Sequence, residues 1–259
     1  MNARSDISFL VASESRTAIL DALASEPQRP TDLARSCDCA RETAQRTLAG
    51  FCNRGWVEKS DGTYRLTPGG KMVYDRYQEL VASVDRADRL GEFLTNVGDT
   101  VIDVEADVLD QLTVTTATDG DPHAPLDRYL TILGDDTVDN FRGVTPIVSR
   151  IFNESAENVL GAETKMELVI DESVLERAKS TYTDSLELAY ELEQFSLRVT
   201  KTELDCGLLL VDGHGAVASY DEDGNMAAIV DGSDEAVLEW IESLYESIRA
   251  QAVPIERRG

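Results

Sequence analysis

The chain contains 259 residues, of which 42% are hydrophobic, and carries a formal net charge of -25 at pH 7. The apolar residues recur with regular spacing, which argues against a disordered acidic protein and suits one large or two ordinary domains. Only 5 of the 24 basic residues are lysine, and such a carboxylate-rich, lysine-poor composition indicates a halophile's cytosol. The longest apolar runs have strand length and no signal peptide is evident, so we expect a cytoplasmic protein.

The charge is divided unevenly along the sequence. Residues 1–95 hold 13 basic and 14 acidic side chains, a net charge near -1, whereas the remainder holds 11 basic and 35 acidic ones, a net charge near -24. Residues 28–71 alone hold 8 basic and 5 acidic side chains. A locally basic module in a strongly acidic chain is the pattern that a DNA-reading domain would leave.

The N-terminal part begins with three helical segments. Apolar residues from Ile7 to about Ser25 predict a first helix, and two prolines in 26–30 end it. Thr31 can cap a short second helix over 32–36, and a brief turn leads to a third helix that begins near Arg41. A short helix, a turn and a second helix follow the helix-turn-helix order.

The third helix has two contrasting sides. Ala44, Leu48 and Phe51 recur at helical spacing and would face a core. The opposite side carries arginine and amide groups, which can pair with guanine and adenine edges in the major groove. We therefore predict a recognition helix whose DNA-contacting residues are Arg41, Thr43, Gln45 and Arg46.

A short hairpin follows this helix. Gly55 ends the helix, and the alternating segments 56–59 and 64–67 flank an Asp-Gly pair, which is among the stronger hairpin signals. On this wing, Lys59 and Arg65 are expected to contact phosphate or the minor groove. The order predicts a winged helix-turn-helix; an amphipathic helix beside a purely structural hairpin is the alternative interpretation.

The cysteines do not form a recognisable disulfide or metal pattern. Cys39 and Cys52 would sit at opposite ends of the recognition helix, roughly 20 Å apart at a rise of about 1.5 Å per residue, so they could not share a site with Cys37. Small buried thiols are the favoured interpretation, and a thiol-sensing role for Cys37 and Cys39 is the alternative.

A long helix is predicted from about Lys71 to Thr95. Its apolar residues follow a 3-4 spacing that is typical of helix pairing, with Gly91 in one position. They are Val73, Tyr77, Leu80, Val84, Ala87 and Leu94. We expect either that this helix pairs with its twin in a homodimer or that it packs on its own domain. Helix-turn-helix proteins usually read two half-sites, which makes the dimer the more economical idea.

The sequence changes character after 96–103. Strands are expected over 111–118, 141–147, 166–170, 195–200, 207–211, 216–220 and 226–230, and helices over 125–133, 148–160, 172–179, 181–193 and 233–250. Alternating strands and helices predict a partly parallel sheet covered by helices, with a meander of late strands at one edge. The predicted fold class is α+β, with an N-terminal winged helix-turn-helix (1–68), a connecting and dimerisation helix (69–97) and a C-terminal α/β effector domain (98–252).

Four segments of the chain resemble one family of regulators. They are the wing with its flanks (55–68), DPHAPLDRY (121–129), RGVTPIVS (142–149) and ELVIDESVL (167–175). The chain is similar to archaeal, mainly haloarchaeal, transcriptional regulators that join a winged helix to a domain like the middle domain of the methanogenesis regulatory protein family. The resemblance covers nearly the whole chain and implies a DNA-binding regulator with a C-terminal sensory or assembly domain. It implies no known ligand.

That second domain also resembles phospholipase D-like folds used without catalysis. The phosphodiesterase chemistry needs His-x-Lys-x4-Asp, in which His attacks phosphorus and Lys holds the phosphate. His214 and Asp221 have this spacing, but Ala216 stands at the lysine position, and His123 has no lysine two residues on. We therefore expect no enzymatic activity; a phosphodiesterase-like enzyme is the least favoured alternative.

The junction before the helix at Pro125 is a candidate effector site. His123 precedes that helix, so backbone N–H groups and an imidazole could face an anion there. Arg142 adds a fixed positive charge in a very acidic domain, and it either pairs with an internal carboxylate, which we favour, or holds a ligand. The ligand hypothesis is that His123, Arg128 and Arg142 frame a site for a small anionic effector.

No metal or cofactor is predicted. The oxygen-rich stretch 221–225 lies between two expected strands, so a solvated hairpin turn explains it better than a Ca²⁺ or Mg²⁺ site. The expected partners are double-stranded DNA and a second copy of the chain, and no membrane. The alternative function is a scaffold whose winged helix binds protein instead of DNA.

Overall fold

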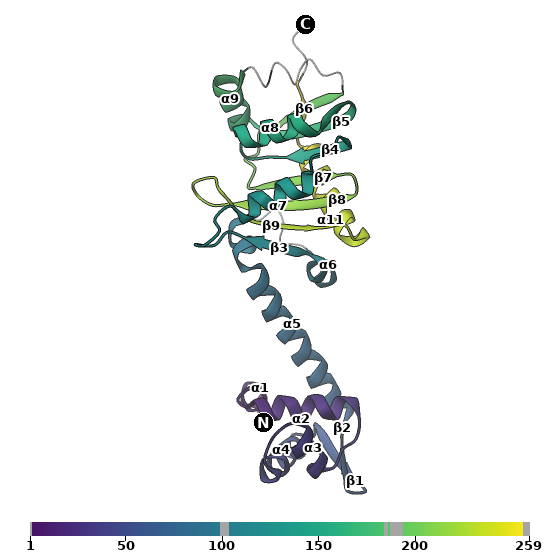
Figure 1. The fold of residues 1–259 in the computed structure, drawn as a ribbon. Coiled ribbons are helices and arrows are strands. Elements are labelled where there is room, and N and C mark those ends of the chain that lie inside the picture. The colour runs from purple at the N-terminus through teal and green to yellow at the C-terminus, as the bar shows by residue number, and fades with distance from the viewer. Residues whose placement is uncertain (1, 99–103, 184–185, 187–193, 256–259) are drawn as a thin grey trace. The chain divides into compact units, whose positions relative to one another are not determined.

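The computed structural model describes residues 2–98, 104–183, 186 and 194–255 (Figure 1). The chain divides into two compact units, residues 1–84 and 85–259. The long helix α5 (Pro68–Asn96) begins in the first unit and ends in the second.

Four helices build most of the N-terminal unit: α1 (Ala3–Val11), α2 (Glu14–Ser25), α3 (Pro30–Ser36) and α4 (Arg41–Asn53). The predicted single helix from Ile7 to Ser25 is wrong, because the chain breaks between Val11 and Glu14. In a continuous helix, which turns about 100° per residue, Leu10 and Ile19 would point in opposite directions. The break allows both side chains to be buried in the same core.

The core of this unit holds the apolar residues expected from the sequence. Its buried members are Leu10, Ile19, Leu20, Leu23, Leu33, Ala44, Leu48, Phe51 and Val57. The beginning of α5 packs on this core through Val73, Tyr74 and Tyr77. In addition, the Tyr74 hydroxyl donates a 2.6 Å hydrogen bond to the Asp21 carboxylate of α2. The first turns of α5 are therefore fixed to the N-terminal unit.

The wing is a two-stranded hairpin. Strands β1 (Val57–Ser60) and β2 (Thr63–Leu66) pair antiparallel. Asp61 and Gly62 between them have φ values of 50° and 83°, and positive φ at both positions is what a tight type I′ turn requires. A backbone bridge from Gln28 to Tyr64 adds a third segment beside β2. Together with α3 and α4, this hairpin completes a winged helix-turn-helix, as predicted.

An eight-stranded sheet forms the centre of the C-terminal unit, in the order β10-β6-β5-β4-β7-β8-β9-β3. The strands are β3 (Thr113–Thr116), β4 (Val138–Val144), β5 (Leu160–Asp171), β6 (Phe195–Thr200), β7 (Cys206–Val211), β8 (His214–Tyr220), β9 (Met226–Gly232) and β10 (Val253–Pro254). Strand β5 runs parallel to β4 and β6, whereas β7, β8 and β9 form an antiparallel meander. The predicted partly parallel sheet is thus confirmed.

Helices cover both faces of this sheet: α6 (Ala106–Gln111), α7 (Ala124–Leu133), α8 (Arg150–Val159), α9 (Glu172–Thr181) and α11 (Glu235–Ala250). Alternate residues of β7 belong to different cores, because successive side chains of a strand point to opposite faces. Leu208 and Leu210 pack in the core that includes α11, whereas Leu209 and Val211 pack in the core that includes α7 and α9. Among the described residues, no helix is both long and apolar enough to cross a membrane.

The end of α5 belongs to the α11 side of the sheet. Leu90 and Phe93 of α5, and Val97 directly after it, are fully buried there. Arg86 also donates two hydrogen bonds of 2.7 Å to the Asp110 carboxylate of α6. The sequence did not predict α6, a single short helix without a periodic pattern. Of the two helices expected after 171, α9 is present, and the one over 181–193 lies mostly outside the described residues.

Candidate DNA-binding surface and effector unit

Helix α4 presents a polar side to solvent. Arg41, Gln45 and Arg46 are exposed, and Thr43 is half-buried, while Ala44, Thr47 and Leu48 face the core. No side chain caps the N-terminus of α4, whose N-cap residue is Ala40, so its first backbone N–H groups remain available to an acceptor. Such a helix end attracts phosphate.

The two predicted wing residues have different surroundings. Arg65 forms a 2.7 Å ion pair with Glu58 directly opposite it on β1, and both side chains are more or less half exposed. Lys59 lies 5.6 Å from the centre of the Tyr64 ring and has no ion pair within the described part of the chain. Lys59 is therefore the freer of the two cations.

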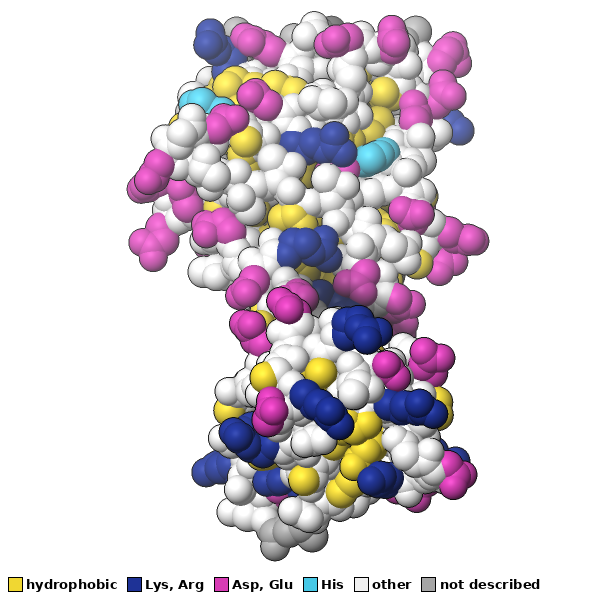
Figure 2. Space-filling view, turned by 60° about the horizontal axis from the view of Figure 1, so that its bottom comes forward, with side chains coloured by type: hydrophobic (Ala, Val, Ile, Leu, Met, Phe, Trp, Pro, Cys, Tyr) yellow, Lys and Arg dark blue, Asp and Glu magenta, His cyan; other side chains and the backbone are white. Residues whose placement is uncertain are grey.

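Three further cations of this unit escaped the sequence prediction. Arg29, Arg35 and Lys71 are exposed, and among the residues that the structure describes none of them forms an ion pair. These three residues contribute to the excess of basic side chains in 28–71, but that count alone did not single out individual residues. Figure 2 shows Lys and Arg side chains spread over the N-terminal unit, whereas Asp and Glu predominate on the other unit.

The cysteines near α4 are free and partly buried. Burial, followed by the neighbouring Cys37 and Asp38, raises the pKa of Cys39. Burial also raises the pKa of Cys52, against the opposing effect of Lys59. Since the thiolate is the reactive and metal-binding form, these environments favour inert structural thiols. Within the described residues, no group of three or more His, Cys, Asp or Glu is arranged to hold a metal ion.

In the C-terminal unit, Arg128 is paired with an internal carboxylate. It donates hydrogen bonds of 2.9 Å and 2.5 Å to the two carboxylate oxygens of Asp231 on β9. Asp231 is only 1% exposed, and His214 Nε2 lies 2.8 Å from its Oδ2 atom. The positive charge of Arg128 is thus used to neutralise the buried carboxylate of Asp231.

Arg142 is also paired, but at the edge of an open polar hollow. Its guanidinium lies 2.5 Å from a carboxylate oxygen of Glu242 on α11 and 5.5 Å from the centre of the Tyr245 ring. From the sequence we favour a pair between Arg142 and an internal carboxylate, and Arg142 has such a partner in Glu242. The polar residues around the hollow are Asn140, Arg142, Lys165, Glu167, Gln194, Ser196, Asp212, His214 and Glu242.

The three predicted effector residues do not meet in one site, and that part of the hypothesis needs correction. Arg128 belongs to α7 and pairs on the α7 side of the sheet, whereas Arg142 pairs with α11 on the other side. His123 is the exposed N-cap of α7 and makes no side-chain cap bond. Asp231, the partner of Arg128, lies two residues after Ile229 on β9 and so points to the α7 side of the sheet. Arg128 does not line the hollow that Arg142 borders. An anionic effector stays a prediction, and only Arg142 borders the polar hollow.

The phosphodiesterase-like spacing of His214 and Asp221 does not create a catalytic pair. The two residues stand at opposite ends of β8, roughly 20 Å apart at about 3.3 Å per strand residue. The Asp221 carboxylate accepts backbone N–H groups from Asp223 at 3.0 Å and from Asn225 at 2.8 Å. It thereby closes the turn between β8 and β9, and hydrogen bonds from Asn225 lower the pKa of Asp221.

Two family models match the chain. The HVO_A0261 N-terminal domain matches residues 4–89, and the middle domain of the methanogenesis regulatory protein FilR1 matches residues 122–251. A search of the curated proteins finds no match.

Several solved structures are similar at low sequence identity. TrmBL2, an archaeal chromatin protein with a novel mode of DNA binding, is 15% identical, with 93% of this chain and 94% of that chain covered and a TM-score of 0.44. Quinone-bound YodB from B. subtilis is 19% identical over 32% of this chain and 97% of its own, with a TM-score of 0.30. The dimethyltransferase RosA from Streptomyces davawensis is 14% identical over 77% and 64%, with a TM-score of 0.24. These similarities are too distant to indicate a shared activity.

Proposed function

This chain belongs to the family defined by the middle domain of the methanogenesis regulatory protein FilR1, and we propose that it is a DNA-binding transcription regulator. Its N-terminal unit carries the module for that role, a winged helix that matches the HVO_A0261 N-terminal domain. Helix α4 would enter the major groove, and the wing would hold the backbone beside it.

The observation that carries this proposal is the exposed polar side of α4. Arg41 and Arg46 have no ion pair within the described residues, although the chain as a whole has 49 acidic residues. Arginines left unpaired in such an acidic protein are available to phosphate or to guanine. At molar salt the Debye length is about 3 Å, so non-specific attraction is weak and base-edge contacts must supply more of the binding.

Chromatin immunoprecipitation in the native host, followed by fluorescence anisotropy on the recovered fragments in molar KCl, tests the proposal. Arg46→Ala should weaken binding to its own sites by about 1–3 kcal/mol if Arg46 reads a base. A uniform loss on all sequences would make Arg46 a phosphate contact instead. Arg76→Ala is the matched control, because Arg76 is 75% exposed but paired with Glu79 on α5. A chain that enriches no DNA and binds no fragment would favour a protein-binding scaffold.

The proposal includes a homodimer formed through α5. Leu80, Val84 and Leu94 are 54%, 52% and 43% exposed on this helix, which is unusual for large apolar side chains at helix-pairing spacing. A dimer of this kind would place two α4 helices on two half-sites of DNA.

The proposal also gives the C-terminal unit a sensory role. The end of α5 is buried in the same core as α11 and the central strands, so a change in that core would act on the helix that leads to the DNA-binding module. A small anionic effector beside Arg142 would bind in the polar hollow. Titration of anionic metabolites with thermal unfolding as the readout tests this, with Arg142→Ala as the variant that should lose the shift.

A further inference from the structure

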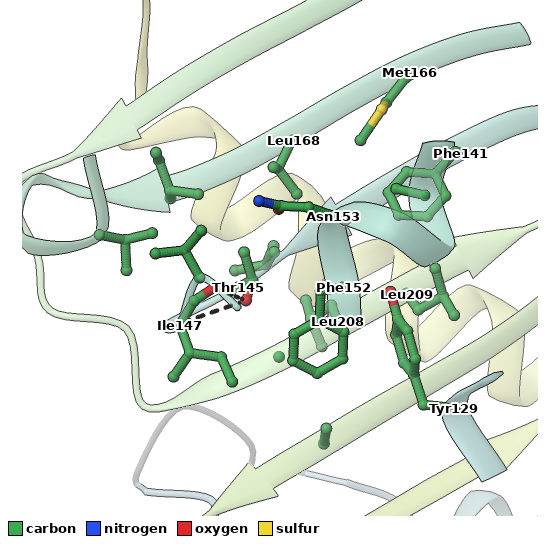
Figure 3. Close-up of a pocket in the computed structure, with 18 of the residues that line it drawn as sticks. Tyr129, Phe141, Thr145, Ile147, Phe152, Asn153, Met166, Leu168, Leu208 and Leu209 are labelled. Atoms are coloured by element: carbon green, nitrogen blue, oxygen red, sulfur yellow. Dashed lines mark hydrogen bonds between the residues drawn. The ribbon is translucent and has the colours of Figure 1, made fainter. Parts of the chain in front are cut away.

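A second hollow in the C-terminal unit has the opposite chemistry. It lies between the sheet and the layer of α7, α8 and α9, and it has a volume of about 180 Å³ (Figure 3). Engineered apolar cavities of about 150 Å³ already bind benzene. The space therefore suits one substituted aromatic ring or an aliphatic molecule of similar size.

The walls of this cavity carry no charge. None of the described residues that line it is Asp, Glu, Lys, Arg or His, although 28% of the chain is charged. Figure 3 shows apolar side chains around it, among them Phe141, Phe152, Leu168 and Leu209. Burying an unpaired charge against such walls would be costly, so the cavity selects an uncharged occupant.

Small residues in the central strands create part of the space. Gly143, Gly207, Ala216 and Ala218 line the cavity on neighbouring strands. A Cβ atom at Gly207 would lie 2.7 Å from the Tyr220 hydroxyl oxygen, and one at Gly143 would lie 3.0 Å from a Phe141 ring carbon. The two glycines therefore let the Tyr220 and Phe141 side chains lie close against the sheet.

Three polar side chains at the cavity have no hydrogen-bond partner among the residues that the structure describes. The hydroxyls of Tyr129 and Tyr220 and the carboxamide of Asn153 make no side-chain hydrogen bond to the described residues, and all three residues line the cavity. In contrast, the Thr145 hydroxyl is occupied, since it donates a 2.7 Å bond to the Ile147 carbonyl. Burial raises the pKa of both tyrosines well above the usual range, so they stay neutral donors. These three residues are half-buried, so a molecule in the cavity could hydrogen-bond to their polar groups.

We propose that this cavity binds an uncharged, mainly apolar molecule of the size of a substituted benzene, with one polar atom that hydrogen-bonds to the Tyr129 hydroxyl. The inference rests on the proposed function in one respect, namely that the occupant acts as an effector of the regulator, separate from the anionic one proposed beside Arg142. Val144 and Leu208 line the cavity and also belong to the core that buries Leu90 and Phe93 of α5. An occupant would therefore press on strands that hold the end of α5.

Three matched probes test the chemistry of the site: toluene, p-cresol and p-toluate, which differ only in bearing no polar group, a hydroxyl or a carboxylate. Calorimetric titration of the full chain in molar KCl should show p-cresol binding most tightly, toluene more weakly and p-toluate at least about tenfold more weakly than p-cresol. If neither p-cresol nor toluene binds up to its solubility limit, or if p-toluate binds best, the proposal is overturned.

Variants locate the binding. Ala156→Leu on α8 places a larger side chain at the cavity wall and should abolish binding of p-cresol and toluene, whereas Asn158→Leu, at an exposed position of the same helix, should leave it unchanged.

Tyr129→Phe keeps the ring that packs edge-on against Phe152 at 5.0 Å and removes only the hydroxyl. It should lower the affinity for p-cresol by about tenfold and leave toluene binding unchanged. Equal binding by wild type and Ala156→Leu would place the probes elsewhere and overturn the assignment.

The DNA measurement is separate, so the two proposals can fail independently. If the chain binds p-cresol but no DNA, the proposed regulator function is refuted and the proposed cavity site is still supported. Binding of p-cresol that leaves the affinity for genomic sites unchanged would overturn its effector role. A change in DNA affinity that is absent in Ala156→Leu supports both proposals together.

Discussion

Arg128 on α7 forms two hydrogen bonds to Asp231 on β9, a residue 103 positions later in the chain. The arginine side chain is 32% exposed, while the aspartate side chain is 1% exposed. The arginine therefore neutralises a buried carboxylate and is not a free cation at the surface. Removing the arginine would leave a buried carboxylate whose remaining side-chain partner among the described residues is His214. This arrangement predicts a structural role that can be measured.

We expect Arg128→Ala to lower the free energy of unfolding by about 2–4 kcal/mol, since losing one member of a buried pair exposes the other to an apolar surrounding. Arg142→Ala is the matched control, because Arg142 and Glu242 are 36% and 50% exposed, and such pairs contribute about 0–1 kcal/mol. Urea unfolding in molar KCl, followed by circular dichroism, gives both values. Equal losses in the two variants would contradict the structural assignment of Arg128.

Glu167 on β5 should give the C-terminal unit a pH-dependent stability. Burial alone would raise its pKa, but hydrogen bonds from Arg249 and Tyr245 and the charges of Arg249 and Arg198 outweigh burial and lower it. A carboxylate with a lowered pKa in the folded state stabilises the fold above its unfolded pKa, about 4.3, and this contribution is lost as the pH falls through the folded pKa.

The measurement compares wild type with Glu167→Gln in molar salt, which screens the general repulsion among carboxylates. Wild type should be the more stable protein from pH 7 to about pH 5, and its advantage should shrink below about pH 4.3. A stability difference that stays constant down to pH 3 would show that the charge of Glu167 contributes nothing to the difference.

Local patterns in the sequence were enough to predict the winged helix, because its helix spacing, its stop at Gly55 and its Asp61–Gly62 turn each depend on neighbouring residues. The break after Val11 was missed because two amphipathic helices in series look like one until the direction of Leu10 is compared with that of Ile19. In each of these cases the residues that decide the structure are close to one another in the sequence.

The candidate effector sites depend on pairings that are distant in sequence. The internal partner favoured for Arg142 is Glu242, which lies 100 positions away, and nothing local identifies it. The apolar cavity was missed for a different reason: part of its space exists because Gly143 and Gly207 have no side chains. In the register of β4 against β7, Gly143 stands opposite Leu209, two residues from Gly207, so both glycines lie on the same face of the sheet.

The thiols should react slowly, which separates structural cysteines from a redox sensor. Because burial raises the pKa of Cys39 and of Cys52, little thiolate forms near neutral pH, and alkylation should accelerate as the pH rises. Cys206, whose pKa burial and Asp205 raise to about 12, should be the slowest of all. Iodoacetamide labelling followed by peptide mass spectrometry measures each rate. Labelling of Cys39 at the rate of a free thiol, together with loss of DNA binding, would support the sensing alternative.

The exposed stripe of α5 gives the sharpest test of the homodimer. Its apolar and small positions continue at 4-3-4-3 spacing: Leu80, Val84, Ala87, Gly91 and Leu94. Val73 and Tyr77 share the same spacing, but they pack on the N-terminal core, so the stripe available to a partner begins at Leu80. Small residues at Ala87 and Gly91 would let two helix backbones approach closely.

Leu80→Glu together with Val84→Glu would place four carboxylates of a dimer in one helix seam and should produce a monomer, because like charges there repel and the apolar contact is lost. Ala82→Glu is the control, since residue 82 lies on the opposite side of the helix at about 100° per residue. Sedimentation equilibrium in molar KCl measures the mass of each variant, and anisotropy on a two-half-site fragment measures its DNA binding. The double variant should bind single half-sites with little change and lose the extra affinity of paired sites. A wild-type chain that sediments as a monomer while binding paired sites at full affinity would refute dimerisation through α5.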